Sequence, residues 1–340
     1  MLRVITEERA IKKYAGLFHK KFKPFVDEQI RVKLGHQGAG FSAKVAWSEK
    51  LGVWKYSQTV RDVRYWNAFG IGKPGTTGVL SIASEINFPW SQIDRKTGGA
   101  FAEDHWGNVF VIHRGQIGGG KKGVGKALFE HHYRGVWSSM EDGNTVSQVA
   151  VIGNLKSEHF ALQAAQFVKK IEMMKQAAAE SVQTEMDFSE ITFREDLIGS
   201  ETPLAEDEIV FACDYDLVVR AMSSQLQQKK IKTGNDTERV LFAVDVKTDR
   251  ISHIFEIVTD TKEKSVLAAS ARLLLQTSAV AVHPRPVLVL PQEAVSRYEQ
   301  ELKRINISVI GFHWQALKVI FSGLDKIDTT QAKPLRCGNT

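Results

Sequence analysis

The sequence predicts an α+β domain at the N-terminus, followed by an α/β domain with a mixed central sheet. A chain of 340 residues, 43% of them hydrophobic, is long enough for two packed domains. Short apolar segments bounded by Gly, Pro and Asn, which are typical of strands, occupy residues 35–113. Strand-like and helix-like segments alternate after residue 214, as in a sheet with helices on its faces. The predicted organisation is a basic, aromatic-rich domain (1–180), an acidic linker (181–208), a second domain (209–320) and a C-terminal tail (321–340).

The first domain is expected to begin with an amphipathic helix within residues 1–34. Its apolar stripe lies opposite several lysines and consists of Ile11, Tyr14, Leu17 and Phe18. Strand-like segments follow from Gly35 onward. The later pattern predicts a helix over Gly125–Tyr133, an apolar strand over Val149–Ile152 and a long helix over Ser157–Glu180.

The second domain is expected to open with a helix over Asp214–Gln228. Two strands then lie within residues 240–260, where V-L-F-A-V-D-V and I-S-H-I-F-E-I-V-T-D are separated by turn residues. This alternation favours a mixed or parallel sheet. The segments that follow are predicted as helix (Lys264–Gln276), strand (Val287–Leu290), helix (Gln292–Arg304) and strand (Ile307–Phe312).

Positive charge and tryptophan are concentrated in the first domain. Residues 1–134 contain 22 Lys and Arg against 11 Asp and Glu, whereas the remainder contains 23 against 28. Six of the seven tryptophans lie within the first 137 residues. A basic, aromatic-rich region joined to an acidic one indicates an anion-binding module, although a basic surface without a partner would have the same composition.

Cysteine content and hydropathy indicate the cellular compartment. Cys213 and Cys337 are too few and too far apart for a disulfide framework or a zinc site. No run of about 18 apolar residues predicts a membrane span, and the N-terminus lacks an apolar signal core. A cytoplasmic protein without membrane contact is therefore expected.

Two carboxylates in the second domain suggest a metal site. Asp245 and Glu256 come from consecutive predicted strands, and Asp260 adds a third acid nearby. Mg²⁺ prefers such hard oxygen ligands, and a bound Mg²⁺ activates water for phosphodiester hydrolysis. The pattern predicts Mg²⁺ held by Asp245 and Glu256, with Lys247 or Lys264 assisting the water. The alternative is that neither acid has a chemical role: Glu256 is then an ordinary polar residue of the sheet, and Asp245 is a charged residue at the edge of a hairpin.

Residues Asp214–Trp314 resemble the PD-(D/E)XK nuclease-like domain found at the C-terminus of many bacterial restriction- or defence-type proteins. The segment F-E-I-V-T-D, which contains Glu256, is similar to that group's F-E-I-K-T-D, and N-D-T-E-R-V-L-F is similar to its N-D-x-x-x-D-L-F. The resemblance places the family's first acidic ligand on Val240, its catalytic lysine on Val258 and its helix glutamine on Arg272. It therefore implies a restriction-endonuclease-like fold in which only the glutamate of the cleavage site is retained.

A glycine-rich basic loop follows the predicted strand Asn108–Ile112 and opens a helix. Its residues Gly120–Lys126 satisfy G-x-x-x-x-G-K, a pattern whose backbone N–H groups can surround a phosphate. The Ser or Thr that a nucleotide-binding loop needs after the lysine is replaced by Ala127. Contact with a nucleic-acid backbone is therefore predicted, and the alternative is a flexible basic surface loop. The predicted contacts are Arg114, Lys121, Lys122 and Lys126.

Two further patterns in the first domain each allow two interpretations. The segment Gly35–Gly40, beside Lys33 and Lys44, is either a tight turn or a phosphate-binding loop. The aromatic residues of Trp54-Lys55-Tyr56 and Arg64-Tyr65-Trp66 lie beside cations and either stack on unpaired bases or belong to the core.

Together these patterns predict a cytoplasmic bacterial protein that binds duplex DNA, with Mg²⁺ as the cofactor of any cleavage. Its second domain would be either an endonuclease with a displaced metal site or a degenerate one kept for DNA contact or for a homodimer. The alternatives are a non-catalytic interaction protein with a nuclease-like fold and a nucleotide-binding protein that uses Gly120–Lys126. Fold alone does not decide among them.

Overall fold

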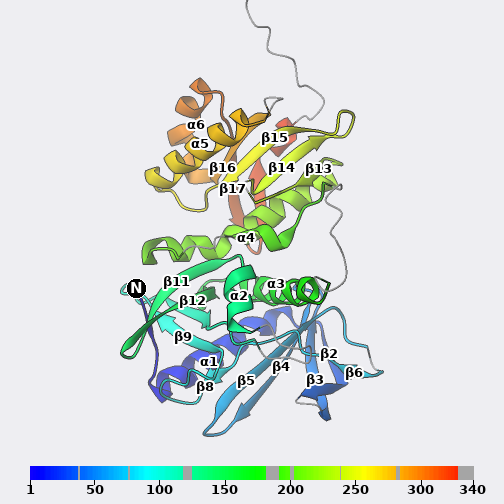
Figure 1. Cartoon of the computed structure of the whole chain (residues 1–340), viewed down its shortest axis with the longest axis vertical. Coiled ribbons are helices and arrows are strands. Elements are labelled where there is room, and N and C mark those ends of the chain that lie inside the picture. Colours follow the sequence, from blue (N-terminus) through cyan, green and yellow to red (C-terminus); the bar gives the residue numbers. More distant parts are fainter. Residues whose placement is uncertain are drawn as a thin grey trace, which may run out of the picture. The chain divides into compact units, whose positions relative to one another are not determined.

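The computed structural model describes residues 1–36, 39–75, 77–117, 125–180, 191–199, 203–237, 239–280 and 284–327 (Figure 1). The chain divides into two compact units. Unit 1 comprises residues 1–185 and 199–214, and unit 2 comprises residues 186–198 and 215–340. The division falls within α4 (Glu206–Gln228), a helix that begins before the predicted Asp214. Ile198, in the segment expected to be a linker, is fully buried in the core of unit 2.

The first sheet of unit 1 is a closed barrel in the order β1-β11-β12-β10-β9. Its strands are β1 (Leu2–Val4), β9 (Gly99–Glu103), β10 (Val109–His113), β11 (Val136–Asp142) and β12 (Thr145–Asn154). β1 closes the barrel because it pairs parallel with β11 and antiparallel with β9. Apolar side chains from all five strands form its core, among them Leu2, Ala102, Phe110, Met140 and Val149.

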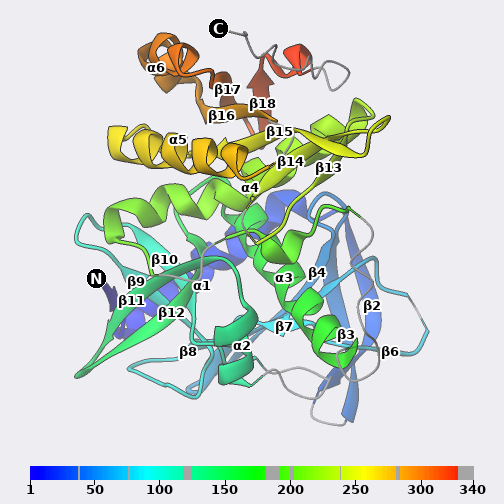
Figure 2. The same ribbon diagram turned by 45° about the horizontal axis from the view of Figure 1, so that its top comes forward.

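The second sheet of unit 1 runs in the order β6-β2-β3-β4-β5-β7, and β8 pairs with β5 (Figure 2). The strands are β2 (Glu28–His36), β3 (Ala39–Ser48), β4 (Val53–Val60), β5 (Arg64–Ile71), β6 (Val79–Leu80), β7 (Ser84–Glu85) and β8 (Phe88–Pro89). One face of this sheet carries a core that includes Trp47, Trp54 and Trp66. Aromatic residues on those strands therefore pack in the interior, as the second of the two interpretations predicted.

The opposite face of the second sheet is covered in part by α1 (Glu8–Phe22). Phe18 and Phe22 of this helix contact Phe69 of β5, with ring centroids 6.3 and 5.5 Å apart. α1 ends in a short 3₁₀ helix (Lys23–Phe25) with Pro24 in its first turn. The other helices of unit 1 are α2 (Lys126–His132) and α3 (Phe160–Glu180).

Unit 2 contains a six-stranded sheet in the order β13-β14-β15-β16-β17-β18. The strands are β13 (Lys232–Gly234), β14 (Leu241–Asp245), β15 (Arg250–Ile257), β16 (Arg285–Pro291), β17 (Ser308–Gln315) and β18 (Lys318–Ser322). β15, β16 and β17 are parallel, and the flanking pairs are antiparallel. The predicted mixture of helices and strands is confirmed, and this sheet is mixed.

Helices cover both faces of the unit 2 sheet (Figure 1). α4 packs on one face through Val218, Val219 and Met222. α5 (Glu263–Ser278) and α6 (Gln292–Arg304) pack on the other face. Short 3₁₀ helices cover Glu195–Leu197 and Leu324–Lys326. Among the described residues, no helix combines the length and the apolar character that a membrane crossing requires.

Candidate functional site

Glu256 lies near the end of β15, on the face of the sheet that α5 covers. Side chains alternate along a strand, so Glu256 shares this face with the buried residues Ile254 and Val258. Its side chain is only 4% exposed. A carboxylate in such an apolar layer needs a charged or hydrogen-bonding partner.

Two side chains of α5 supply these partners. Gln276 Nε2 donates a hydrogen bond to Glu256 Oε1 at 3.3 Å, and Arg272 Nε lies 3.6 Å from the same oxygen. Burial raises the pKa of the Glu256 carboxyl, whereas the Arg272 charge and the Gln276 hydrogen bond oppose that rise. The carboxylate that the sequence assigned to a metal ion is therefore held by a guanidinium and an amide.

Asp245 lies at the other end of the β14–β15 hairpin. It pairs with Arg250, and its carboxylate accepts a hydrogen bond from the backbone N–H of Lys247 at 2.8 Å. Arg250 and Glu256 are six positions apart on β15, which corresponds to roughly 20 Å of extended strand. The structure therefore does not bring Asp245 and Glu256 together, and the prediction that they share one Mg²⁺ requires correction.

The remaining acids and lysines of the predicted site are also dispersed. Lys247 lies in the exposed hairpin turn beside Asp245, and Lys264 lies in the exposed first turn of α5. Asp260 accepts hydrogen bonds from the Lys262 N–H and from Ser265 Oγ, both at 2.8 Å, at the start of α5. No group of three or more His, Cys, Asp or Glu side chains suited to a metal ion occurs among the described residues.

Of the three positions at which the chain departs from the PD-(D/E)XK pattern, Val258 and Arg272 lie on the Glu256 face of the sheet and Val240 does not. Val240 lies just before Leu241, which pairs with Phe255 in the core on the α4 face. Val240 packs against the core, and Val258 is buried two residues beyond the glutamate. Among the described residues, Arg272 is the ion-pair partner of Glu256, and no second acid joins it in a group suited to a metal ion.

Arg114 was expected to contact a nucleic-acid backbone, but it is only 8% exposed. Its Nη2 lies 3.2 Å from Oδ1 of Asp142, a residue that is itself 2% exposed, and its Nη1 donates to the Thr97 carbonyl at 3.4 Å. An arginine held this way is paired in the interior and does not present its charge at the surface. The prediction for Arg114 is therefore wrong.

The neighbouring His113 is also a structural residue. Its Nδ1 accepts a hydrogen bond from the Gly115 N–H at 3.1 Å, and its Nε2 lies 3.2 Å from the Glu85 carbonyl oxygen. Burial lowers the pKa of His113 to about 4. This pair of contacts fits the neutral ring, in which one nitrogen accepts and the other donates.

The other cations of the glycine-rich loop are placed only in part. Lys126 is the first residue of α2 and forms an exposed ion pair with Glu130 at 3.5 Å. Lys121 and Lys122 lie outside the described residues. The structure therefore neither assembles nor separates the predicted phosphate contacts of this loop.

A second group of cations lies on one face of the β2–β3 hairpin. Arg31 pairs with Lys44, and Lys33 pairs with Ser42, so these four side chains share one face of the sheet. All four are exposed. Arg31, Lys33 and Lys44 form no ion pair with any residue that the structure describes. We call these three residues and Ser42 the basic face.

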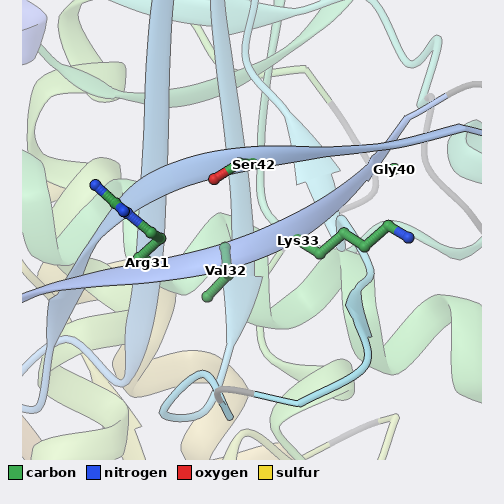
Figure 3. A pocket seen from close by; sticks show the side chains of 5 residues that line it. All are labelled: Arg31, Val32, Lys33, Gly40 and Ser42. Atoms are coloured by element: carbon green, nitrogen blue, oxygen red, sulfur yellow. The ribbon is translucent and has the colours of Figure 1, made fainter.

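The basic face borders a surface hollow of about 430 Å³, which Arg31, Val32, Lys33, Gly40 and Ser42 line. Figure 3 shows Arg31 and Lys33 extending from β2 in different directions, with Ser42 and Gly40 on β3. A Cβ atom at Gly40 would lie 2.6 Å from Lys33 Cε, so the missing side chain makes room for the lysine stem. The segment around Gly40 is thus part of a hairpin, as the tight-turn interpretation predicted, with cations beside it.

The sequence contained a signal for this face that a helical interpretation of residues 1–34 obscures. The segment E-Q-I-R-V-K-L alternates polar and apolar residues, which is the period of a strand. Val32 and Leu34 are buried on the core face, and Arg31 and Lys33 point to the opposite one.

The chain matches no protein-family model, no curated protein and no solved structure. The function of the chain is therefore inferred from the geometry of the Glu256 site and of the basic face.

Proposed function

We propose that the protein binds duplex DNA through the basic face of unit 1, and that the Glu256 site of unit 2 does not cleave it. The observation that supports binding is the set of three exposed cations without ion pairs, Arg31, Lys33 and Lys44. Free surface cations attract the phosphate backbone and release its condensed counterions when they bind it. The excess of positive charge in residues 1–134 also attracts a polyanion such as DNA.

The spacing of the cations suits a charged backbone. Arg31 and Lys33 are two residues apart on one strand, roughly 7 Å, and Lys44 lies roughly 5 Å across the ladder from Arg31. Each cation can therefore contact a different phosphate oxygen. Ser42, on β3 opposite Lys33, adds a hydroxyl group that can donate a hydrogen bond to the backbone.

A duplex is favoured over a single strand by the position of the aromatic rings. Proteins that bind single strands without sequence preference usually stack bases on exposed aromatic side chains. The tryptophans of this sheet, Trp47, Trp54 and Trp66, are buried on the face opposite the cations. The basic face offers phosphate contacts alone, which a duplex backbone satisfies.

The nuclease-like character of unit 2 remains part of the proposal. It is supported by the resemblance of residues Asp214–Trp314 and by the position of the retained Glu256 near the end of β15. Loss of cleavage is supported by the partners of Glu256, because Arg272 and Gln276 occupy its carboxylate. A non-catalytic protein with a nuclease-like scaffold is the form of the proposal that these contacts favour.

The experiment compares two variants that each lose three positive charges. Binding of a labelled duplex is measured by fluorescence anisotropy for the wild type, for Arg31→Gln/Lys33→Gln/Lys44→Gln, and for the control Lys229→Gln/Lys303→Gln/Arg304→Gln. The control residues are exposed in unit 2. We expect the affinity of the basic-face variant for the duplex to fall about tenfold or more at about 100 mM salt. The slope of log K against the logarithm of the salt concentration should become less negative by about 0.9 for each lost phosphate contact.

The control variant is expected to change the affinity by less than about threefold, because its charges are not among the proposed contacts and act only through net charge, which salt screens. Equal losses in the two variants would mean that only net charge matters and that the basic face is not the site. Absence of binding by the wild type would overturn the proposal entirely.

A further inference from the structure

Lys55 on β4 is a buried cation that no carboxylate balances. It is 7% exposed, and no described Asp or Glu lies within ion-pair distance of it. Buried lysines are usually paired with an acid, because an isolated charge in the interior is costly. Burial lowers the pKa of Lys55 to about 7.

The environment of the Lys55 ammonium is aromatic on one side and polar on the other. Its Nζ lies 5.2 Å from the ring centroids of both Phe18 and Phe22. On the polar side it donates to Ser57 Oγ at 2.5 Å and lies 3.3 Å from His19 Nδ1. Ser57 Oγ in turn donates to Oδ1 of Asn67 at 2.7 Å.

The polar side of this cluster opens to solvent. Ser57 and His19 are exposed, although the lysine between them is not. The charged and titratable groups that face Lys55 are His19 from α1 and, beyond it, Lys23. Burial first, and then the charges of Lys55 and Lys23, lower the pKa of His19. An anion bound here would therefore meet donors and positive charge, with no acid to repel it among the described residues.

The cluster lies on the same face of the sheet as the basic face. Lys55 pairs with Ala46, which is two residues from Lys44 on β3. Because alternate residues share a face, Lys44 and Lys55 point to the same side, roughly 7 Å apart along the strand direction. A backbone that follows the basic face can thus continue over Ser57 and His19.

We propose that Lys55, Ser57 and His19 form a binding site for one phosphate group of the nucleic-acid backbone. The phosphate oxygens accept hydrogen bonds from the His19 ring and from the Ser57 hydroxyl, which rotates away from Asn67 Oδ1 when the phosphate binds. The ammonium beneath them supplies the missing counter-charge. The site rests on the proposed function, because it extends the basic face by one phosphate contact. It adds a property that Arg31 and Lys33 do not have, namely dependence on pH near neutrality.

The direction of the pH dependence follows from linkage. The phosphate binds the protonated form of Lys55, so binding raises the pKa of the amine and takes up a proton. Affinity for the duplex is then expected to fall as the pH rises above about 7, by at most about tenfold per pH unit for one proton. Arginine and exposed lysine stay charged over this range and contribute no such slope.

The experiment measures duplex affinity between about pH 6 and about pH 8.5 for the wild type, Lys55→Met, Ser57→Ala and the matched control Lys33→Met. Lys55→Met is expected to remove the pH dependence attributable to the site and to lower affinity mainly at acidic pH. Ser57→Ala should lower affinity about threefold or more at pH values where Lys55 is charged. Lys33→Met should lower affinity by a similar factor at every pH. A wild-type affinity that is independent of pH and unchanged in Lys55→Met would overturn the inference.

A second measurement separates this inference from the proposed function. The titration of the Lys55 amine is followed by NMR with and without inorganic phosphate as the probe. A rise in its pKa on addition of phosphate, absent in Ser57→Ala, supports the site even if the wild type binds no duplex. Duplex binding without either a phosphate effect on Lys55 or a pH slope would leave the basic face intact and reject the Lys55 site.

Discussion

The partners of two equally buried cations distinguish them. Arg114 was predicted to contact a nucleic-acid backbone, whereas Lys55 was noted only as the neighbour of aromatic residues that could stack on bases. Arg114 is neutralised by Asp142, whereas Lys55 faces two aromatic rings, a hydroxyl and an imidazole. Sequence shows that both residues carry charge, but it does not show whether an acid from a distant strand will meet them. Asp142 comes from β11 and reaches Arg114 only when the barrel closes.

At the scale of single residues, Lys55 should make the stability of the protein depend on pH. The folded-state pKa is about 7, against 10.5 for the ordinary amine. Between these values the unfolded chain binds a proton that the folded chain does not, so stability rises with pH across this window. Below about pH 7 the folded state carries the full cost of burying the charge, on the order of 5 kcal/mol.

Lys55→Met should therefore raise the free energy of unfolding at pH 6 to 7 by a few kcal/mol, and its advantage should shrink as the pH approaches about 10. Urea denaturation at several pH values measures this, with Lys33→Met as the reference for other titrating groups. A variant that is less stable than the wild type at pH 6 would show that the buried ammonium is well compensated in the free protein.

At the scale of elements, local periodicity predicted most helices and failed where pairing is distant. The predicted helix Gly125–Tyr133 corresponds to α2, and the predicted Lys264–Gln276 corresponds to α5. Both have apolar residues at helical spacing, so a short window of sequence is sufficient to identify them. β1 has only three residues and is defined by partners in β9 and β11, roughly a hundred residues away. No local pattern contains that information.

Two glycines of unit 1 should respond in opposite directions to the same substitution. Gly16 lies in α1 with nothing within 4 Å of an added Cβ, so Gly16→Ala should stabilise the protein by about 0.5–1 kcal/mol. At Gly70 of β5 an added Cβ would lie 2.4 Å from ring atoms of Trp54, so Gly70→Ala should destabilise it by about 1–3 kcal/mol. Thermal unfolding of both variants provides the measurement. A neutral Gly70→Ala would indicate that Trp54 can move without cost, contrary to its burial at 1% exposure.

At the scale of the whole molecule, the sequence predicted the succession of helices and strands in unit 2 but not which of their side chains meet. The predicted order of helices and strands after residue 214 occurs in unit 2. The prediction that Asp245 and Glu256 hold one metal ion was wrong because the strand register, and not proximity in the sequence, decides which residues are neighbours. On the Glu256 face, the residue two positions beyond the glutamate is Val258, and an apolar side chain there cannot ligate a cation.

The intact protein should therefore bind supercoiled plasmid without nicking it in the presence of Mg²⁺ or Mn²⁺. Cleavage by two-carboxylate chemistry needs a second acid near Glu256 and a group that activates water, whereas the contacts there are Arg272 at 3.6 Å and Gln276 at 3.3 Å. Gel analysis of the plasmid, with Glu256→Ala purified in parallel, tests this expectation. Nicking that requires the metal and disappears in Glu256→Ala would establish an active site at this carboxylate and contradict its assignment as a degenerate one. Nicking that persists in Glu256→Ala would instead come from elsewhere, and the assignment of Glu256 would stand.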